Sequence, residues 1–181
     1  MQSHRHPLAT ASDALLDAVI ALNAAVVDMT GPLDRVRLDR MIAAAVFAEA
    51  RLTADGTLAG FLIGFGPEAD HDSGNFLWFR DRIAAFAYID RVVVAPAARG
   101  GGIGRALYAD FADTAARHGL ARLACEVNIA PPNPVSDAFH GALGFVETGT
   151  GSPAPGKRVR YLLRDIDAPV RATVPPLAGN D

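Results

Sequence analysis

The chain has 181 residues, of which half are hydrophobic and 20% are charged, and its formal net charge at pH 7 is −3. This profile is typical of one soluble globular domain, and the acidic balance argues against a nucleic-acid-binding surface. The single cysteine, Cys125, excludes an intramolecular disulfide, and no apolar run approaches the ~18 residues that a membrane span needs. Residues 1–13 lack the apolar core of a signal peptide, so we expect a cytoplasmic protein that binds neither nucleic acid nor membrane.

The front half of the chain predicts two helices and then a hairpin. In chain order, the expected elements are a helix over residues 8–29, a short helix over 35–44, and strands over 46–53 and 58–64. Ser12 or Asp13 is a suitable N-cap for the first helix. Asp55-Gly56, between the two strands, is a strong hairpin-turn signal.

The back half of the chain alternates strands with helices and ends in an antiparallel pair. The expected elements are a polar loop over 66–73, an aromatic segment over 75–79, a strand over 85–94, a helix over 103–118, a strand over 120–127, a short helix over 135–143, and paired strands over 145–148 and 159–164. This order predicts an α/β (α+β) fold with a mixed, mostly antiparallel central sheet of about six to seven strands and helices on both faces. We expect a single domain over residues 1–167 and a poorly ordered Pro/Ala-rich tail over 168–181.

The stretch from Ile89 to Tyr108, IDRVVVAPAARGGGIGRALY, joins a strand, a glycine loop and the start of a helix. The apolar run ends at Pro96, four glycines follow within residues 100–104, and helix-forming residues begin near Ile103. Backbone N–H groups and the helix dipole converge at such a loop, because few side chains stand in the way. The pattern therefore predicts an anion-binding site.

Two other phosphate-binding loops fit this stretch poorly. A dinucleotide-binding loop needs G-x-G-x-x-G/A directly after a strand, with an acidic residue about 20 positions later. Glu126 lies near that distance, but the third glycine position holds Leu107 or Arg105, depending on where the count starts. A P-loop is excluded because no Gly-Lys-Ser/Thr follows. A loop that merely turns the chain is the remaining alternative, and the folding entropy of four glycines argues against it.

The segment Arg99-x-x-Gly102-x-Gly104 resembles the R/Q-x-x-G-x-G/A loop of the GNAT superfamily of N-acetyltransferases. In that family, the loop and the helix N-terminus after it hold the pyrophosphate of acetyl-CoA. The context agrees, because a Val-rich strand precedes the loop and Ile103 and Leu107 share one face of the helix.

Residues 133–145 resemble a second GNAT motif, N-x-x-A-x-x-L-Y-x-x-x-G-F, which follows the fifth strand of the family. The matching positions are Asn133, Ser136, Phe139, His140, Gly144 and Phe145. Ser136 stands where Ala is usual, and His140 stands where a Tyr often protonates the departing thiolate. The resemblance covers about residues 45–165, and the combination of EVN, PPNP and LGF with NFLWF upstream resembles a bacterial subgroup of the family.

The resemblance implies direct transfer of an acetyl group from acetyl-CoA to a primary amine of a small molecule or peptide, with no metal. The strand over 85–94 would diverge from the strand over 120–127, and the thioester would lie in the gap. A backbone N–H near Val93 or Val94 would point at the thioester oxygen, a contact worth roughly 3–4 kcal/mol in other acyl-transfer enzymes. The residues expected to contact acetyl-CoA are Val92, Val93, Val94, Arg99, Gly100, Gly101, Gly102, Ile103, Gly104, Arg105, Asn128, Asn133, Ser136 and Phe139.

His140 is the candidate general acid. An imidazole can donate a proton near neutral pH, so the replacement of Tyr by His keeps a proton donor but shortens its reach. The alternative is that His140 packs on the short helix without touching the ligand.

Asp90 and Glu126 are the candidate general bases, and Tyr88 or a chain of water molecules could serve instead. Alternation along the strand would place four side chains on one face, those of Tyr88, Asp90, Val92 and Val94. Asp90 would then lie in line with the acetyl site. Its alternative role is an ion pair with an arginine such as Arg91 or Arg122.

Two further clusters have structural explanations. The aromatic residues Phe76, Trp78 and Phe79 could line the acceptor side with Asn75, but we expect at least two of them to belong to the core. The run from Asp70 to Asp72 contains His71 but has no distant fourth ligand, so we expect a solvated loop and no metal.

The sequence is compatible with three functions. The leading hypothesis is an acetyl-CoA-dependent N-acetyltransferase. The alternative is a non-catalytic acetyl-CoA/CoA-binding sensor or interaction module, and the third is a nucleotide-binding oxidoreductase, which the misplaced third glycine disfavours. The exposed edge of the last two strands could also pair two subunits into a homodimer.

Overall fold

A seven-stranded sheet forms the centre of the molecule. The computed structural model describes residues 2–166, so the expected tail over 168–181 lies outside the described residues. The strand order is β1-β2-β3-β4-β5-β7-β6. The strands are β1 (Ser3–Pro7), β2 (Phe47–Thr53), β3 (Leu58–Phe65), β4 (Phe86–Val94), β5 (Arg122–Ala130), β6 (Val146–Ala154) and β7 (Lys157–Asp165). Every neighbouring pair is antiparallel except β4 and β5, which confirms the predicted mixed, mostly antiparallel sheet.

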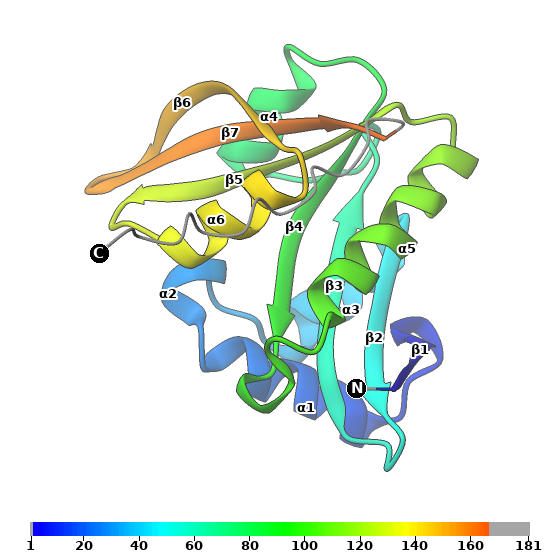
Figure 1. The fold of residues 1–181 in the computed structure, drawn as a ribbon. Coiled ribbons are helices and arrows are strands. Elements are labelled where there is room, and N and C mark those ends of the chain that lie inside the picture. Colours follow the sequence, from blue (N-terminus) through cyan, green and yellow to red (C-terminus); the bar gives the residue numbers. More distant parts are fainter. Residues whose placement is uncertain (1, 167–181) are drawn as a thin grey trace, which may run out of the picture.

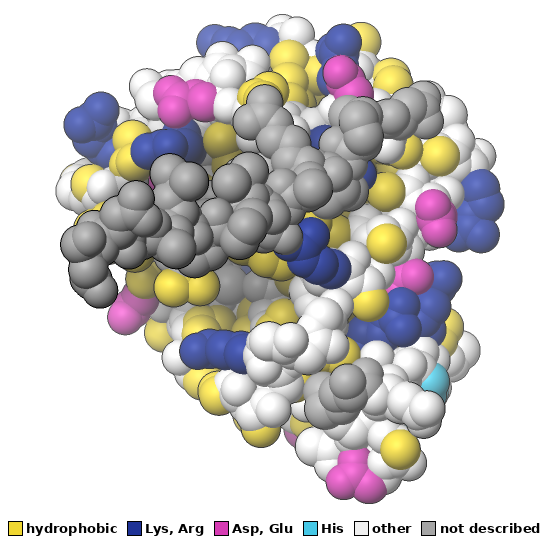
Figure 2. All heavy atoms as spheres, viewed as in Figure 1, with side chains coloured by type: hydrophobic (Ala, Val, Ile, Leu, Met, Phe, Trp, Pro, Cys, Tyr) yellow, Lys and Arg dark blue, Asp and Glu magenta, His cyan; other side chains and the backbone are white. Residues whose placement is uncertain are grey.

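Helices cover both faces of this sheet (Figure 1). They are α1 (Asp13–Ala24), α2 (Val27–Thr30), α3 (Arg35–Ala44), α4 (Gly74–Arg80), α5 (Ile103–Arg117) and α6 (Pro134–Ala142). One buried cluster packs beneath α1, α3 and α4 and includes Leu38, Phe76 and Tyr88. The other packs beneath α5 and α6 and includes Leu107 and Phe111. On the uncovered part of the surface in Figure 2, acidic and basic side chains are interspersed.

The predicted elements of the front half are present with shifted ends. The expected helix over 8–29 divides into a 3-10 turn (Leu8–Thr10), α1 and α2. Ser12 caps α1, since its side chain accepts a hydrogen bond from the Leu15 N–H at 3.3 Å. The Asp55-Gly56 turn joins β2 to β3, and the φ of Gly56 is +83°, which suits glycine. Among residues 2–166, no helix combines the length and the hydropathy of a membrane span.

The edge strand β1 was not predicted, because its residues are mostly polar and show no apolar alternation. It pairs antiparallel with β2, with Arg5 opposite Arg51. The Arg5 guanidinium donates to both carboxylate oxygens of Glu49, at 2.5 and 2.6 Å. Backbone pairing and this cross-strand ion pair therefore stabilise β1, which buries little apolar surface.

A β-bulge in β4 changes which side chains face the site. Arg91 lies opposite Ile63, whereas Ile89 lies opposite the next residue of β3, Gly64, so Asp90 is the extra residue. Beyond the bulge, Val92 and Val94 pack against the cluster beneath α5, whereas Tyr88 belongs to the other cluster. The prediction that Tyr88, Asp90, Val92 and Val94 share one face is therefore wrong, because the extra residue reverses the alternation.

The C-terminal hairpin is longer than predicted. Strand β6 extends to Ala154 and β7 begins at Lys157, so the two strands continue beyond their predicted ends at residues 148 and 159. The aromatic segment over residues 75–79, for which the sequence predicted no helix, lies inside α4. Ser73 caps this helix by accepting a hydrogen bond from the Asn75 N–H at 3.3 Å.

Candidate active site

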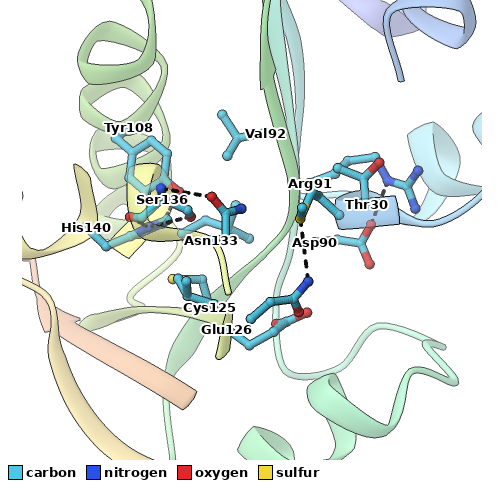
Figure 3. A pocket seen from close by; sticks show the side chains of 14 residues that line it. Thr30, Asp90, Arg91, Val92, Tyr108, Cys125, Glu126, Asn133, Ser136 and His140 are labelled. Carbon is cyan, nitrogen blue, oxygen red and sulfur yellow. Dashed lines mark hydrogen bonds and ion pairs between the residues drawn. The ribbon is translucent and has the colours of Figure 1, made fainter. Parts of the chain in front are cut away.

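A gap opens between the two parallel strands at the centre of the sheet. Within residues 2–166, β4 and β5 pair at three positions, the last of which is Tyr88 opposite Ala124. Beyond this point β4 stays paired with β3 as far as Val94, and β5 stays paired with β7 as far as Ala130. The two strands therefore diverge, and a cavity of about 100 Å³ lies between them (Figure 3).

Seven of the predicted site residues line this cavity. They are Asp90, Val92, Glu126, Asn128, Asn133, Ser136 and His140. Val93 lies instead in the core beneath α1, because it is on the opposite face of β4 from Val92. Val94 and Phe139 pack around Gly104 at the start of α5, where a Cβ on Gly104 would lie 3.1 Å from the Phe139 ring. The absence of a side chain at Gly104 thus lets α5 approach α6 closely.

The glycine loop lies at the N-terminus of α5. Gly100 and Gly102 have φ values of +74° and +82°, which L-residues with a Cβ rarely adopt. Gly102 is the N-cap and offers no side chain, so the first-turn N–H groups of the 15-residue helix have no side-chain cap. Arg99 and Arg105 are exposed on either side of the turn. This arrangement of free N–H groups, helix dipole and guanidinium groups suits a phosphate group.

Glu126 is a carboxylate held in an environment that favours its protonated form. Its two oxygens accept hydrogen bonds from the Asn75 amide and the Tyr88 hydroxyl, both at 2.8 Å. Burial, the largest influence, and the negative charge of Asp90 together raise the pKa of Glu126 to about 7, against the opposing effect of the two hydrogen bonds. A group with this pKa can accept and release a proton near neutral pH.

Asp90 has the opposite electrostatic environment. His71 Nε2 lies 2.9 Å from one carboxylate oxygen and Arg91 Nε lies 2.8 Å from the other. Burial would raise the pKa of Asp90, but the His71 hydrogen bond and the Arg91 charge outweigh it and hold the pKa below its usual value. The ion-pair alternative, with Arg91 as partner, is therefore confirmed. Arg91 also donates to Asn23 of α1 at 3.0 Å.

His71 does not lie in a solvated loop, and the prediction for this residue is wrong. Its side chain is 7% exposed and stacks on Phe76, with ring centroids 4.9 Å apart. The Ser73 N–H donates to His71 Nδ1, so the proton of the neutral ring is on Nε2 and points at Asp90. The loop folds inward because the aromatic cluster and Asp90 provide partners that the local sequence does not reveal.

His140 lies at the wall of the cavity opposite Asp90, and Ser136 lies one turn earlier on α6 (Figure 3). His140 Nδ1 is 2.7 Å from the Ser136 carbonyl oxygen, and Nε2 is 2.7 Å from the Tyr108 hydroxyl. Burial lowers the pKa of His140, which favours the neutral ring. Asn133 is the N-cap of the same helix and accepts a hydrogen bond from the Ser136 N–H at 3.1 Å, which leaves its amide N–H groups for a ligand.

The aromatic segment belongs mainly to the core, as predicted. Phe76 and Phe79 are fully buried. Trp78 stacks on Tyr161 of β7 with ring centroids 4.0 Å apart. Asn75 does face the site, since it donates to Glu126 and accepts a hydrogen bond from the Tyr161 hydroxyl at 3.2 Å.

A family model matches most of the chain. The model described as the acetyltransferase (GNAT) family aligns with residues 29–145. The chain belongs to the GNAT acetyltransferase family. It is therefore an acyltransferase by family, and the resemblance seen in the glycine loop and in residues 133–145 is confirmed. No curated protein sequence matches the chain significantly.

Solved GNAT structures share this fold along nearly their whole length. A GCN5-related N-acetyltransferase from Kribbella flavida is 23% identical, with a TM-score of 0.65 over 90% of this chain and 97% of that chain. The ribosomal-protein-S18-alanine N-acetyltransferase from Escherichia coli is 18% identical, with a TM-score of 0.63 over 93% and 96%. A chain of the NatC complex bound to Gag peptide and CoA is 16% identical, with a TM-score of 0.67 over 91% and 99%. At these identities, the likeness shows the fold.

The sequence did not indicate Tyr108 as a residue of this site, nor the contact of Asn75 with Glu126. Tyr108 lines the cavity from α5, and Asn75 orients Glu126 from α4. Tyr108 directly follows Leu107 on the buried side of α5, so the helical period indicated burial but not a polar partner. Asn75 was expected only as a possible lining residue of the acceptor side, because its contact with Glu126 spans 51 positions of sequence and leaves no local pattern.

Proposed function

We propose that this GNAT protein transfers an acetyl group from acetyl-CoA to a primary amine of a small molecule or peptide, with Glu126 as the general base. The observation that carries the proposal is the gap between β4 and β5, which places Glu126 in a cavity that also contains His140 and Tyr108. A thioester in this gap would lie between a proton acceptor and a proton donor. Amine acetylation needs both, because the attacking nitrogen loses a proton and the leaving sulfur gains one.

Glu126 fits the role of base better than Asp90. Asp90 is engaged by His71 and Arg91, and its lowered pKa makes it a weak proton acceptor. The pKa of Glu126, about 7, is matched to proton transfer at neutral pH. We therefore assign Asp90 to holding the bulge of β4 and Glu126 to receiving the amine proton.

The glycine loop supports acetyl-CoA as the donor. Residues 99–105 present uncapped N–H groups and two exposed guanidinium groups where β4 ends and α5 begins. Free N–H groups and nearby positive charges are what a helix N-terminus needs to bind a diphosphate. Val92, Asn128 and Asn133 would contact the pantetheine arm in the gap. The NatC structure, which is similar in fold, is described as bound to CoA, and this supports the same donor.

The test has two steps. The first is a thermal-shift titration with acetyl-CoA, with NAD(H) as the negative control. The second is a screen for free-thiol release over amino acids, polyamines, aminoglycosides and peptide N-termini. Stabilisation together with thiol release that depends on one class of amine supports the proposal. Stabilisation without thiol release from any amine would instead indicate a non-catalytic CoA-binding module, and a response to NAD(H) alone would exclude both.

A further inference from the structure

Tyr108 and His140 form a hydrogen-bonded pair whose proton positions follow from their partners. His140 Nδ1 lies 2.7 Å from the Ser136 carbonyl oxygen, which can only accept. In the neutral ring the proton is therefore on Nδ1, and Nε2 carries a lone pair. The Tyr108 hydroxyl, 2.7 Å from Nε2, must then be the donor. Resting His140 has no proton to offer on the side that faces Tyr108.

The two side chains come from different helices and meet at the cavity. Tyr108 is on α5, the helix that begins at the glycine loop, and His140 is on α6. Both line the cavity, and their exposed fractions are 1% and 4%. Their rings pack edge to face with Phe145, which fixes their orientation. A buried hydroxyl held this rigidly at a cavity wall is a preorganised donor.

We propose that the Tyr108 hydroxyl, rather than the His140 imidazole, contacts the departing CoA sulfur and gives it a proton. His140 is then a positioning residue, which orients the Tyr108 hydroxyl and resupplies its proton. The inference rests on the proposed acetyl transfer and names the acid of that reaction.

The active form carries one more proton than the resting pair, so that protonated Nε2 donates to the Tyr108 oxygen and the Tyr108 O–H points into the cavity. When the C–S bond breaks, its electron pair goes to sulfur, the Tyr108 proton moves to sulfur, and the Nε2 proton moves to the Tyr108 oxygen. The acceptor ammonium loses two protons in becoming an amide nitrogen. One of them restores the active pair, and the other passes through Glu126 to solvent.

Few ionisable groups of the described chain face the pair. Cys125 and Glu126 of β5 act on Tyr108, and Asp137 of α6 acts on His140. Burial raises the pKa of Tyr108 well above 10, the negative charges of the β5 groups add to this effect, and the phenol stays protonated over the range in which an alkyl thiol ionises, near pH ~8.5. The hydroxyl can therefore stabilise a thiolate by hydrogen bonding.

The experiment measures the ionisation of the CoA thiol in its complex with the protein. Ultraviolet absorbance of the thiolate is followed against pH for the CoA complex, with the complex of desulfo-CoA, which lacks the sulfur, as the blank. The blank cancels the absorbance of Cys125 and of the tyrosines. A hydrogen bond to a charged group favours the charged form tenfold or more, so Tyr108→Phe should raise the pKa of the bound thiol by at least one unit.

Three further variants separate positioning from folding. His140→Gln keeps an N–H that can donate to the Tyr108 oxygen and so leave the Tyr108 O–H free for sulfur. It should therefore hold the pKa of the bound thiol close to the parent value, although it cannot pass a proton. His140→Ala removes the donor that orients the Tyr108 hydroxyl and should raise the pKa of the bound thiol toward that of the Tyr108→Phe complex. Thr114→Val removes another buried hydroxyl of α5, whose partner is Arg117, and should change nothing.

The outcomes distinguish this inference from the proposed function. If CoA and desulfo-CoA fail to stabilise the parent protein, acetyl-CoA is not its donor and both proposals fall. If both bind and the thiol of the Tyr108→Phe complex titrates as in the parent, Tyr108 does not contact the sulfur, and the inference is overturned while acetyl transfer stands.

Discussion

Asp90 and Glu126 are carboxylates on neighbouring strands, and their surroundings give them opposite roles. Asp90 has a positive partner and a hydrogen-bonded His71, whereas Glu126 has two neutral donors, Asn75 and Tyr88. An arginine beside a buried carboxylate stabilises its charge, and neutral donors compensate only part of the cost of burial. The two pKa values therefore move apart, and this separation identifies which carboxylate can act as a base.

Glu126→Gln should lower kcat/KM at pH 7.5 by about a hundredfold or more, because it removes the proposed general base and keeps the shape of the side chain. In the parent, kcat/KM should rise with pH through about 7 as Glu126 loses its proton, and the variant should lack this rise. The pH profile of thiol release checks both. Glu147→Gln, an exposed carboxylate 3.8 Å from Arg160, is the matched control and should keep the parent profile.

The Glu126→Gln variant should be more stable than the parent at alkaline pH. The pKa of Glu126 is raised from 4.5 to about 7 in the folded protein, so its contribution to stability is fully present below pH 4.5 and is lost as pH rises through 7. Gln does not titrate. The free energy of unfolding of Glu126→Gln should therefore exceed that of the parent by about 2 kcal/mol at pH 8 and by much less at pH 5, as measured by urea denaturation. An equal difference at both pH values would contradict the assigned pKa.

Asp90→Asn should destabilise the fold by about 3 kcal/mol at pH 7, because it leaves the buried Arg91 charge without its anion. The pKa of Asp90 is lowered, so its contribution is present above the ordinary value of 3.8 and fades as pH falls below it. Urea denaturation at pH 7 and pH 3.5 checks this direction. Asp165→Asn, in the exposed pair with Arg122, should cost less than 1 kcal/mol.

At the scale of elements, the sequence predicted what local signals encode. Hydrophobic period, caps and the Asp55-Gly56 turn located α3, α5, β2 and β3 within a few residues. The glycine spacing indicated the phosphate loop because a tight turn depends on neighbouring residues. The bulge at Asp90 was missed because it depends on β3, and β1 was missed because its stability comes from β2. Contacts between residues distant in sequence, such as Tyr108 with His140, leave no local pattern.

Glycines at the two ends of α5 allow a test of the glycine loop. The test separates an effect on CoA binding from an effect of backbone strain. Gly102 and Gly119 both have positive φ, +82° and +73°, and a Cβ on either would meet nothing within 4 Å. Alanine should therefore cost each site a similar ~1 kcal/mol in stability. Gly102→Ala should in addition weaken CoA binding severalfold, because it moves the N–H groups proposed to bind the diphosphate. Isothermal titration with CoA checks this prediction, and equal affinities of the two variants would remove the loop from the binding site.

At the scale of the whole molecule, the sheet consists of two halves, β1–β4 and β5–β7–β6, joined at a short parallel contact. Three pairs at Phe86–Tyr88 connect them along the sheet. Helix α4 connects them again, through the Trp78 stack on Tyr161 and the Asn75 bond to Glu126. This arrangement holds the gap open while each half keeps its own hydrogen bonds.

Because β4 and β5 diverge beyond Tyr88, their backbone groups that face the gap do not pair with each other. Acetyl-CoA bound in the gap should provide hydrogen-bonding partners for these groups. Amide hydrogens that face the gap in residues 89–94 and 125–130 should exchange rapidly in the free protein and slow at least tenfold with saturating acetyl-CoA, since ligand polar groups would take the place of solvent. Hydrogen exchange read by mass spectrometry checks this, with residues 49–52 of β2, which are paired with both β1 and β3, as the internal control. Equal slowing across β2 and the gap would indicate general stabilisation by a ligand bound elsewhere, and protection confined to the two gap strands would place the donor between the halves of the sheet.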